Sequence, residues 1–363
     1  MRLALVGSRG IPANYGGFET FTEELAVRLV ERGHDVVVYC RLNNVVSREP
    51  VYRGVRRVLL PTIPHKYFDT LAHTALATLH LLVRRQDAAL YCNGANAIFT
   101  LAPRLAGVPT ALNVDGIERK RRKWNRLARA WYLVSERLAT FCPTELVSDA
   151  EAIRSYYRER YGKDSRAIAY GADFERCETT ETLERLGLDP GGYILYVSRF
   201  EPENNALLVR RAFERTRLDL KLVLVGDAPY AADYVAELRR TQDPRVLLPG
   251  AIYGQGYREL QTHCLAYVQA TEVGGAHPAL IEALGRGALT LYLRTPENEE
   301  VAGGAALPFS PDEGELAALL ERVAGLPEKE RQQWRDRAAA RAAERYDWER
   351  VVDAYEELFR EMA

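Results

Sequence analysis

The stretch TEVGGAHPALIEALG at residues 271–285 is the starting point for predicting the fold and the ligand of the whole chain. Gly274 and Gly275 allow the backbone to approach a ligand, and Pro278 suits the first position of a helix because it has no N–H to leave unpaired. A loop that opens onto a helix N-terminus presents free N–H groups and a positive dipole, so we expect it to bind a phosphate or diphosphate. Glu282 lies one turn further along the same helix face, where its carboxylate could accept hydrogen bonds from sugar hydroxyls.

This pattern alone does not decide the function, because a glycine pair before a buried helix is also common in plain strand-to-helix connections. The composition narrows the number of domains and the classes of partner that we expect. The chain has 363 residues, 47% of them hydrophobic, which favours two domains because single cores stop growing near roughly 250–300 residues. The formal net charge of −1 gives no general attraction to nucleic acid or to a membrane, so such a contact would need a local patch.

The five cysteines are scattered and form no C-x-x-C pair. We therefore expect free thiols in a reducing compartment rather than disulfides or a zinc site. The chain opens with MRLALVG, which reads directly as a strand, so no signal peptide is expected. These features predict a cytoplasmic protein, at most peripheral on the inner face of the plasma membrane.

Short apolar strands alternate with helices through the first half of the chain. A strand at 3–6, a long loop at 7–17, a helix at 18–32 and a strand at 36–39 form the opening. This alternation predicts a doubly wound parallel sheet, whose ligands bind beyond the carboxyl ends of the strands. The first loop departs from G-x-G-x-x-G, and Arg41 rather than an acidic residue follows the second strand, which argues against a nicotinamide enzyme.

Two segments of this half are candidates for ligand contact. The loop at 7–17 is longer than a plain connection requires. The segment NVDGIERKRRKW at 113–124 places Asp115 just past the end of a strand, where catalytic groups of such sheets lie. Cations and tryptophans are interleaved over 119–131, which suits an anionic lipid headgroup or an acceptor diphosphate. A solvated helix face is the alternative, and nucleic acid is not expected.

A second series of strands is expected in the C-terminal half, at 193–199, 222–226, 246–250, 266–270 and 289–292. Arg199 ends the first of these strands and the glycine-rich loop follows the fourth. Both are therefore expected at one sheet edge, where a guanidinium opposite a helix N-terminus would clamp a diphosphate. An ion pair with Glu201 or Glu203 is the alternative for Arg199. The last helix, at 346–358, carries an apolar stripe that needs a surface to cover.

With these features the chain resembles, over both halves, the retaining nucleotide-sugar glycosyltransferases of the GT-B fold, a glycosyltransferase family 4-like group. The resemblance implies an α/β protein with two Rossmann-like domains that face each other across a cleft. The nucleotide sugar would bind the C-terminal domain, and the last helix would cross back onto the N-terminal one. We expect an acceptor domain at 1–170, a donor domain at 171–343 and a crossover helix at 344–363.

More narrowly, several blocks resemble the bacterial rhamnosyltransferase branch, which transfers rhamnose from dTDP-rhamnose to a lipid-linked sugar in surface-polysaccharide assembly. These blocks are GIP at 10–12, YGGFE at 15–19, VDGIE at 114–118, KW at 123–124, RFEPENN at 199–205 and GGAHP at 274–278. The chain departs from the broader family at three positions. Gly274 replaces the first Glu of the Glu-x7-Glu motif that ends on Glu282, Asn204 replaces a lysine, and Asn113 replaces the histidine of a His-Asp pair.

Together, the residues and the resemblance assign a candidate site. The catalytic residues are expected to be Asp115, Arg199 and Glu282. Donor contacts are expected from Gly17, Arg199, Asn204, Gly274, Gly275, Ala276, His277 and Glu282. Acceptor contacts are expected from Arg9, Tyr15, Gly16, Glu19, Glu118 and Lys123.

No Asp-x-Asp motif occurs in the sequence, so we expect no metal and no cofactor, with a nucleotide-diphosphate sugar as donor substrate. Arg199 and the helix end would then offset the diphosphate charge. Two other functions remain open at this point. One is a sugar-nucleotide epimerase on the same scaffold, and the other is a non-catalytic subunit that binds a nucleotide sugar.

Overall fold

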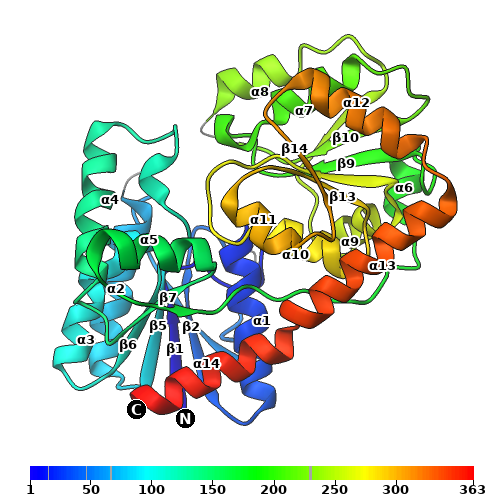
Figure 1. Ribbon diagram of the computed structural model, residues 1–363. Coiled ribbons are helices and arrows are strands. Elements are labelled where there is room, and N and C mark those ends of the chain that lie inside the picture. Colours follow the sequence, from blue (N-terminus) through cyan, green and yellow to red (C-terminus); the bar gives the residue numbers. More distant parts are fainter. Residues whose placement is uncertain (15, 46, 66–67, 229–230) are drawn as a thin grey trace. The chain divides into compact units, whose positions relative to one another are not determined.

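The computed structural model describes residues 1–363 apart from 15, 46, 66–67 and 229–230. The chain forms two compact units. Unit 1 comprises Met1–Tyr170 and Trp348–Ala363, and unit 2 comprises Gly171–Asp347. In each unit, helices pack against a central sheet (Figure 1).

The described residues of unit 1 form an eight-stranded sheet in the order β3-β4-β2-β1-β5-β6-β7-β8. Its strands are β1 (Arg2–Val6), β2 (Asp35–Arg41), β3 (Val51–Tyr52), β4 (Val55–Leu60), β5 (Ala88–Cys92), β6 (Thr110–Asn113), β7 (Glu145–Ser148) and β8 (Arg166–Ala167). Neighbouring strands are parallel except for β3 and β4. The inner strands β1, β2, β5 and β6 are almost wholly buried, as expected for parallel strands covered on both faces.

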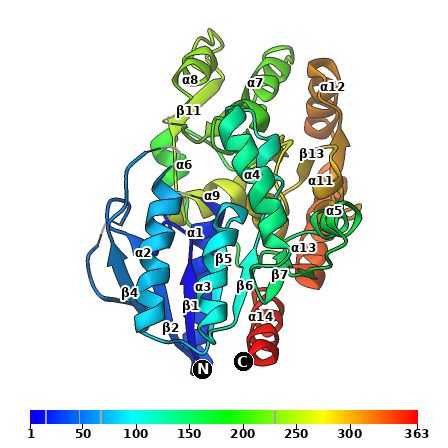
Figure 2. The same ribbon diagram turned by 90° about the vertical axis from the view of Figure 1, so that its left-hand side faces the viewer.

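The strand order reverses at β1, and this reversal places helices of unit 1 on both faces of the sheet. The helical elements are α1 (Gly17–Glu31), α2 (Asp69–Val83), η1 (Gly94–Thr100), α3 (Leu101–Leu105), η2 (Glu118–Lys120), α4 (Arg126–Ala139), α5 (Glu151–Tyr161) and α14 (Trp348–Met362). Because crossovers between parallel strands are right-handed, α1 lies on one face of the sheet and α2, α3 and α4 lie on the other. Figure 2 shows these last three helices side by side.

The C-terminal helix α14 belongs to unit 1 and packs against α1. Its apolar stripe is buried, as the sequence pattern predicts. Aromatic rings dominate the contact. Phe21 of α1 lies 5.4 Å from the ring of Tyr355 and 6.5 Å from that of Trp348, measured between centroids. The helix that ends the chain therefore completes the hydrophobic core of the unit in which the chain begins.

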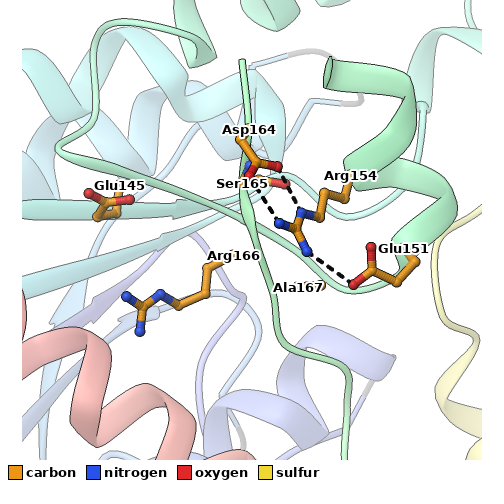
Figure 3. Close-up of a pocket in the computed structure, with 7 residues that line it drawn as sticks. All are labelled: Glu145, Glu151, Arg154, Asp164, Ser165, Arg166 and Ala167. Carbon is orange, nitrogen blue, oxygen red and sulfur yellow. Dashed lines mark hydrogen bonds and ion pairs between the residues drawn. The ribbon is translucent and has the colours of Figure 1, made fainter. Parts of the chain in front are cut away.

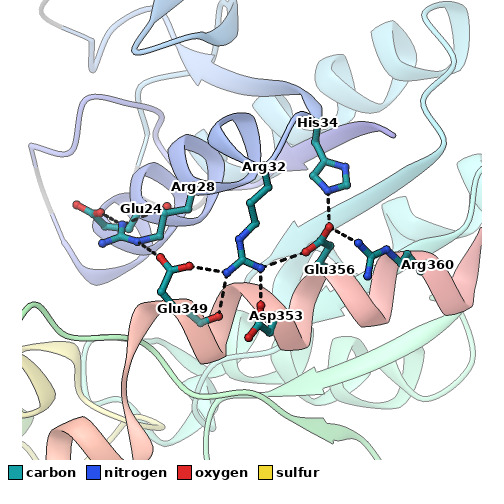
Figure 4. A network of polar contacts seen from close by, with 8 residues as sticks. All are labelled: Glu24, Arg28, Arg32, His34, Glu349, Asp353, Glu356 and Arg360. Atoms are coloured by element: carbon teal, nitrogen blue, oxygen red, sulfur yellow. Dashed lines mark hydrogen bonds and ion pairs between the residues drawn. The ribbon is translucent and has the colours of Figure 1, made fainter.

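Polar contacts at the edge of this interface fix the orientation of α14 (Figure 4). Arg32, at the end of α1, donates to Glu349 at 2.5 Å, to Asp353 at 2.5 Å and to Glu356 at 3.1 Å. His34 Nε2 lies 2.9 Å from the second oxygen of Glu356. Among these carboxylates, Glu356 is the one that is mostly buried. The hydrogen bond from His34 and the contact with Arg32 hold the pKa of Glu356 below its usual value of 4.5.

Glu356→Gln is expected to lower the free energy of unfolding by about 1 kcal/mol at neutral pH, the scale of one favourable ion pair near a surface. Because folding lowers the pKa of Glu356, its stabilising contribution is complete above the usual value and is lost as the pH falls through the lowered one. Urea unfolding of both proteins should therefore show a difference at pH 7 that disappears in acid. Glu159→Gln, an exposed change on α5, is the control. Equal differences at both pH values would contradict the assignment.

The described residues of unit 2 form a parallel six-stranded sheet in the order β11-β10-β9-β12-β13-β14. The strands are β9 (Tyr193–Val197), β10 (Lys221–Val225), β11 (Val246–Gly250), β12 (Ala266–Gln269), β13 (Thr290–Leu293) and β14 (Leu307–Phe309). The helices are α6 (Glu181–Leu186), η3 (Pro202–Asn204), α7 (Ala206–Glu214), α8 (Ala232–Leu238), α9 (Gly254–His263), α10 (Pro278–Gly285), α11 (Pro296–Ala302), α12 (Glu313–Ala324) and α13 (Glu328–Arg345). The strand order reverses between β9 and β12.

The predicted fold class, two doubly wound α/β domains, is confirmed. The differences concern short strands at or next to the sheet edges. The strands β3, β7 and β8 of unit 1 and β14 of unit 2 were not predicted from the sequence. These strands have two to four residues and include Glu145, Arg166 and Pro308. Such segments are too short and too polar, or too rich in proline, to give a strand pattern.

Candidate functional site

The point at which the strand order of unit 2 reverses brings two predicted segments together. β9 and β12 are parallel neighbours, so the loop after β9, which begins near Arg199, and the loop at 270–277 leave the same edge of the sheet. Ligands of doubly wound sheets bind at such reversals. The two loops are also bonded to each other. The N–H of Glu272 donates to the carbonyl of Glu203 at 2.9 Å, and the Asn205 amide donates to the carbonyl of Ala270 at 2.9 Å.

Helix α10 begins at Pro278, as predicted, with His277 as the N-cap residue. Among the described residues, no side chain caps this helix end by a hydrogen bond. Pro278 has no N–H, and the N–H of Leu280 donates to the carbonyl of His277 at 3.0 Å. In the first turn this leaves the N–H of Ala279, together with the positive end of the helix dipole, to attract an anion. Ala276, within the same loop, is buried.

A side chain from α11 fixes the orientation of His277. Its Nδ1 atom lies 2.7 Å from Oδ1 of Asn298. Asn298 is completely buried and uses its amide nitrogen to donate to the carbonyls of Thr271 and Leu293, at 3.1 and 2.8 Å. The amide oxygen of Asn298 must therefore accept, so Nδ1 of His277 carries a proton and donates to it.

The imidazole of His277 occupies the space beside Gly274. A Cβ atom added to Gly274 would lie 2.4 Å from Nε2 and 2.8 Å from Cδ2 of His277. Real Cβ atoms do not approach other atoms this closely. Position 274, where the broader family has a glutamate, therefore accepts only glycine while His277 keeps this orientation.

Gly274→Ala is expected to weaken binding of a nucleotide-sugar donor about tenfold, because the loop must move away from the imidazole. In a His277→Ala background the same change should cost little, since the obstructing ring is gone. A double-mutant cycle on donor affinity, measured by calorimetry, would show this coupling. Additive effects of the two substitutions would mean that the ring and residue 274 do not interact.

The loop after β9 is held by Asn204, which stands where the family has a lysine. Asn204 is buried, and its amide donates to the backbone carbonyl of Arg199 at 2.7 Å. The hydroxyl of Tyr196 donates to the carbonyl of Asn204, also at 2.7 Å. Asn204 thus supplies loop geometry rather than a positive charge. The Arg199 side chain is half-buried at the carboxyl end of β9.

Glu282 lies on the second turn of α10 and is also half-buried. Its carboxylate accepts a hydrogen bond of 2.5 Å from the hydroxyl of Tyr257. Gln261 donates to that hydroxyl at 2.7 Å, and Arg286 donates to the Gln261 oxygen, also at 2.7 Å. Burial raises the pKa of Glu282, and the nearby charge of Arg286 and the Tyr257 hydrogen bond offset this only in part.

Glu282→Gln is expected to raise the free energy of unfolding at neutral pH by about 1 kcal/mol, the usual scale for a single substitution. Because folding raises the pKa of Glu282, the carboxyl group favours the folded state fully below its usual pKa and less as the pH rises through the raised value. Glutamine stays neutral and keeps the Tyr257 hydrogen bond. Thermal melting should show the gain at pH 7 and little difference at pH 4. A loss of stability at pH 7 would contradict this account.

The described acceptor residues predicted near the N-terminus lie in the loop between β1 and α1 or on the first turn of α1. Glu19, on the first turn of α1, is buried and accepts a hydrogen bond from the backbone N–H of Arg9 at 2.9 Å. Gly16 caps the helix in an extended conformation. Gly17, a predicted donor contact, is the first residue of α1 and so belongs to unit 1, whereas the other predicted donor contacts belong to unit 2. Tyr15 lies outside the described residues.

Asp115 follows β6 and has a positive φ of 59°. Its backbone N–H donates to the side-chain oxygen of Asn113 at 3.0 Å, and the Asn113 amide donates to the hydroxyl of Tyr355 at 3.1 Å. Asn113, where the family has a histidine, therefore fixes the turn that presents Asp115 and links it to α14.

The predicted acceptor residue Glu118 is largely engaged within its own segment. It is buried, and its two oxygens accept from Arg121 at 2.5 Å and from Trp124 at 3.3 Å. The ammonium group of Lys123 lies 5.0 Å from the centre of the Trp124 ring. Arg119 of the same segment donates to Glu136 at 2.9 Å. Part of the cationic run is thus neutralised by internal ion pairs.

A surface pocket of unit 1 contains none of the predicted residues (Figure 3). It has a volume of about 390 Å³ and is lined by Glu145, Glu151, Arg154, Asp164, Ser165, Arg166 and Ala167. Most of its charges are paired, since Arg154 contacts Asp164 at 2.7 Å and Glu151 at 3.3 Å, and Arg166 contacts Glu361. We therefore assign it no ligand.

The described part of the chain holds no cluster of three or more histidine, cysteine or acidic residues that could bind a metal ion. Within the same residues, no helix is long and apolar enough to cross a membrane.

Asn298 and Tyr257, which orient His277 and Glu282, were not predicted from the sequence. They lie 21 and 25 residues away from their partners in the chain. No local pattern predicts such contacts, because both are side-chain hydrogen bonds between separate helical elements.

Part of the chain matches a known protein family. Residues 16–171 match the glycosyl transferase 4-like domain. The family resemblance is thus supported for the part of the chain that forms most of unit 1. No curated protein matches the chain in sequence.

Solved structures share the GT-B fold with this chain. HepE of Anabaena, in complex with UDP and glucose, has a TM-score of 0.78 at 16% identity and covers 99% of both chains. Sucrose-phosphate synthase of Thermosynechococcus elongatus has a TM-score of 0.79 at 16% identity, over 99% of this chain and 98% of that one. WaaG, a glycosyltransferase involved in lipopolysaccharide biosynthesis, has a TM-score of 0.73 at 15% identity, over 97% and 99%.

Proposed function

We propose that the protein is a glycosyltransferase that moves a sugar from a nucleoside-diphosphate donor to a saccharide acceptor. The observation that carries the proposal is the arrangement at the strand reversal of unit 2. There, the loop that carries Arg199 and the loop that leads into α10 leave the same sheet edge and are hydrogen-bonded to each other. No described side chain caps the N-terminus of α10. A guanidinium and a helix N-terminus together offset the charge of a leaving diphosphate.

The position of Glu282 supports the proposal that the diphosphate belongs to a nucleotide. It lies one turn deeper on α10, where its carboxylate can accept hydrogen bonds from ribose hydroxyls. Two features of the loop favour a donor sugar different from glucose. Gly274 brings no carboxylate, and the imidazole of His277 occupies the space beside it. We propose L-rhamnose from dTDP-rhamnose, because the blocks at 10–19, 114–124 and 199–205 resemble that branch.

The proposed acceptor is a lipid-linked saccharide in surface-polysaccharide synthesis, at the cytoplasmic face of the membrane. The proposed reaction retains the anomeric configuration, with Asp115 near the reacting hydroxyl. The departing phosphate oxygen takes the proton of that hydroxyl as the new glycosidic bond forms. In this scheme the negative charge of the diphosphate is offset by Arg199 and the α10 N-terminus rather than by a metal ion.

A thermal-shift screen of dTDP-, UDP- and GDP-sugars tests the donor, because a ligand that binds only the folded state raises the melting temperature. We expect selective stabilisation by dTDP-rhamnose. The selected donor is then incubated with lipid-linked saccharides from bacterial membranes, and nucleotide release is followed. Release that depends on the acceptor supports transfer, and NMR of the product reports the anomer.

Other outcomes of these assays identify the alternatives. Interconversion of the donor sugar without any acceptor would indicate an epimerase. Tight donor binding without turnover on any acceptor would indicate a non-catalytic binding subunit. Stabilisation by none of the nucleotide sugars would contradict the proposal as a whole.

A further inference from the structure

Helix α4 of unit 1 exposes part of its apolar surface together with three arginines, Arg126, Arg129 and Arg137. Its buried residues are Tyr132, Ser135, Glu136 and Ala139. In contrast, Leu127 and Val134 are 80% and 50% exposed, and Phe141, just beyond the helix end, is 53% exposed. A surface helix of a soluble domain normally buries its apolar stripe. In α4 the exposed apolar side chains instead form a stripe that the described residues of unit 1 do not cover.

The inward side of α4 is stable because its carboxylate is fully bonded. Glu136 accepts hydrogen bonds from Arg119 at 2.9 Å, Tyr156 at 2.7 Å and Tyr161 at 2.8 Å. These contacts fix the rotation of α4 about its axis, since turning the apolar stripe inward would break all three. The hydrogen bonds of Glu136 therefore keep the apolar stripe of α4 exposed.

The neighbouring helices repeat this exposure. On α2, Leu76, Leu79 and Val83 follow helical spacing and are all exposed. On α3, Leu105 is 78% exposed. Both helices and α4 contact the η1 segment, and Figure 2 shows the three helices side by side. We call α2, η1, α3 and α4 together the outer helical face. Exposed apolar side chains gathered on one such surface mark an interaction site.

The charge of the outer helical face has one sign. Every residue of these four elements is described, and their only carboxylates are Asp69, which pairs with Arg41 at 2.5 Å, and the inward Glu136. The exposed cations on these helices or next to them are Arg84, Arg85, Arg104, Lys120, Arg122, Arg126, Arg129 and Arg137, and the neighbouring Asp87 pairs with Arg2. By contrast, α14, which packs with α1 on the other face of the sheet, carries several exposed carboxylates, including Asp353 and Glu357.

We propose that the outer helical face docks on the surface of an anionic lipid bilayer. Its leucine, valine and phenylalanine side chains enter the headgroup region, and the surrounding arginines contact lipid phosphates. A second copy of the chain is a poorer occupant, because a symmetric contact would bring two cationic surfaces together. This placement extends the expected lipid contact from 119–131 to α2 and α3. It agrees with a lipid-linked acceptor but does not depend on the proposed function, because lipid binding requires neither donor nor turnover.

Cosedimentation with phosphatidylcholine vesicles, with and without phosphatidylglycerol, tests the proposal on the full chain. We expect binding to the anionic vesicles that weakens as salt is raised, and little binding to the neutral ones. Leu127→Glu/Val134→Glu and Leu79→Glu/Val83→Glu should each abolish it. The control Phe174→Glu/Tyr253→Glu changes two exposed aromatic residues of unit 2 and should bind as the wild type does.

A second pair of variants separates charge from packing. Arg126→Gln/Arg129→Gln should weaken vesicle binding by about fivefold for each arginine, with an unchanged melting temperature. Arg239→Gln/Arg240→Gln, two adjacent exposed arginines of unit 2, is the matched control and should have no effect. These variants remove no buried contact, so they keep the test valid if a glutamate variant fails to fold.

Three results would overturn the proposal. The first is an absence of wild-type binding to anionic vesicles. The second is binding that survives all changes on the outer helical face. The third is a dimer in light scattering, without lipid, that Leu127→Glu/Val134→Glu dissociates, because the face would then be an interface between copies. Donor binding in the thermal-shift screen is unaffected by any of these results, so failure here is distinct from failure of the proposed function.

Discussion

Arg199→Ala is expected to lower turnover of the nucleotide-sugar donor by about 10²- to 10³-fold, the usual effect of removing one preorganised group that stabilises transition-state charge. Arg199 stands at the carboxyl end of β9, beside the strand whose following loop leads into α10. Negative charge grows on the diphosphate as the bond to the sugar breaks. The guanidinium therefore contributes more to the transition state than to donor binding, and kcat should fall more than donor affinity.

The backbone of this loop should survive the substitution. Asn204 bonds to the carbonyl of residue 199 and not to its side chain, and Tyr196 holds Asn204 in turn. The melting temperature of Arg199→Ala should thus stay close to that of the wild type. Arg199→Lys keeps the charge but loses the planar fork, so partial activity would show how much of the effect needs two parallel hydrogen bonds.

Steady-state kinetics with the donor found in the thermal-shift screen provide the measurement. Arg240→Ala, which removes an exposed arginine at the end of α8, serves as the control and should keep full activity. Wild-type turnover in Arg199→Ala would remove the main support for the donor site. Reduced turnover together with a large drop in melting temperature would instead indicate a structural role for Arg199.

The sequence predicted well those features that depend on local patterns. The buried strands β1, β5, β9 and β12 are short apolar runs, and their order along the chain places the loops that follow them at sheet edges. The start of α10 at Pro278 follows from proline chemistry alone. That the loops carrying Arg199 and Gly274 leave the same sheet edge could be predicted, because these loops follow strands that are neighbours in such a fold.

Features that depend on distant side chains could not be predicted. The rotation of α4 depends on Glu136 and on two tyrosines of the segment around α5, so the cationic run alone did not reveal which helix side is exposed. The structural roles of Asn204 and Asn113 could not be predicted from the sequence either. An asparagine in place of a lysine or histidine is read from sequence as a lost charge, whereas the structure shows a gained backbone contact at each position.

Asp115→Asn is expected to lower turnover by about 10²-fold while donor affinity stays unchanged, as for loss of one electrostatic group at a reacting centre. Glycosyl transfer passes through a transition state with positive charge on the sugar, as in glycoside hydrolysis. A carboxylate near the reacting hydroxyl stabilises that charge, and a neutral amide does not. Asp115 is half-exposed at the end of β6, on a turn fixed by Asn113.

The backbone of Asp115 makes asparagine the suitable replacement. Its φ of 59° lies in the left-handed region, which asparagine tolerates as well as aspartate does. Asp115→Asn should therefore keep the wild-type melting temperature and isolate the loss of charge. Asp115→Ala adds backbone strain of about 1–2 kcal/mol and should melt earlier. Asp219→Asn, an exposed change in unit 2, controls for the substitution itself.

The residual activity of Asp115→Asn distinguishes two roles for Asp115. If the carboxylate acts through its charge, turnover falls while donor affinity stays unchanged. If the variant keeps the wild-type rate, another carboxylate performs this role. The turn after β6 would then serve to shape the loop through Asn113 and Tyr355, and catalysis would have to be assigned to other residues at the same sheet edge.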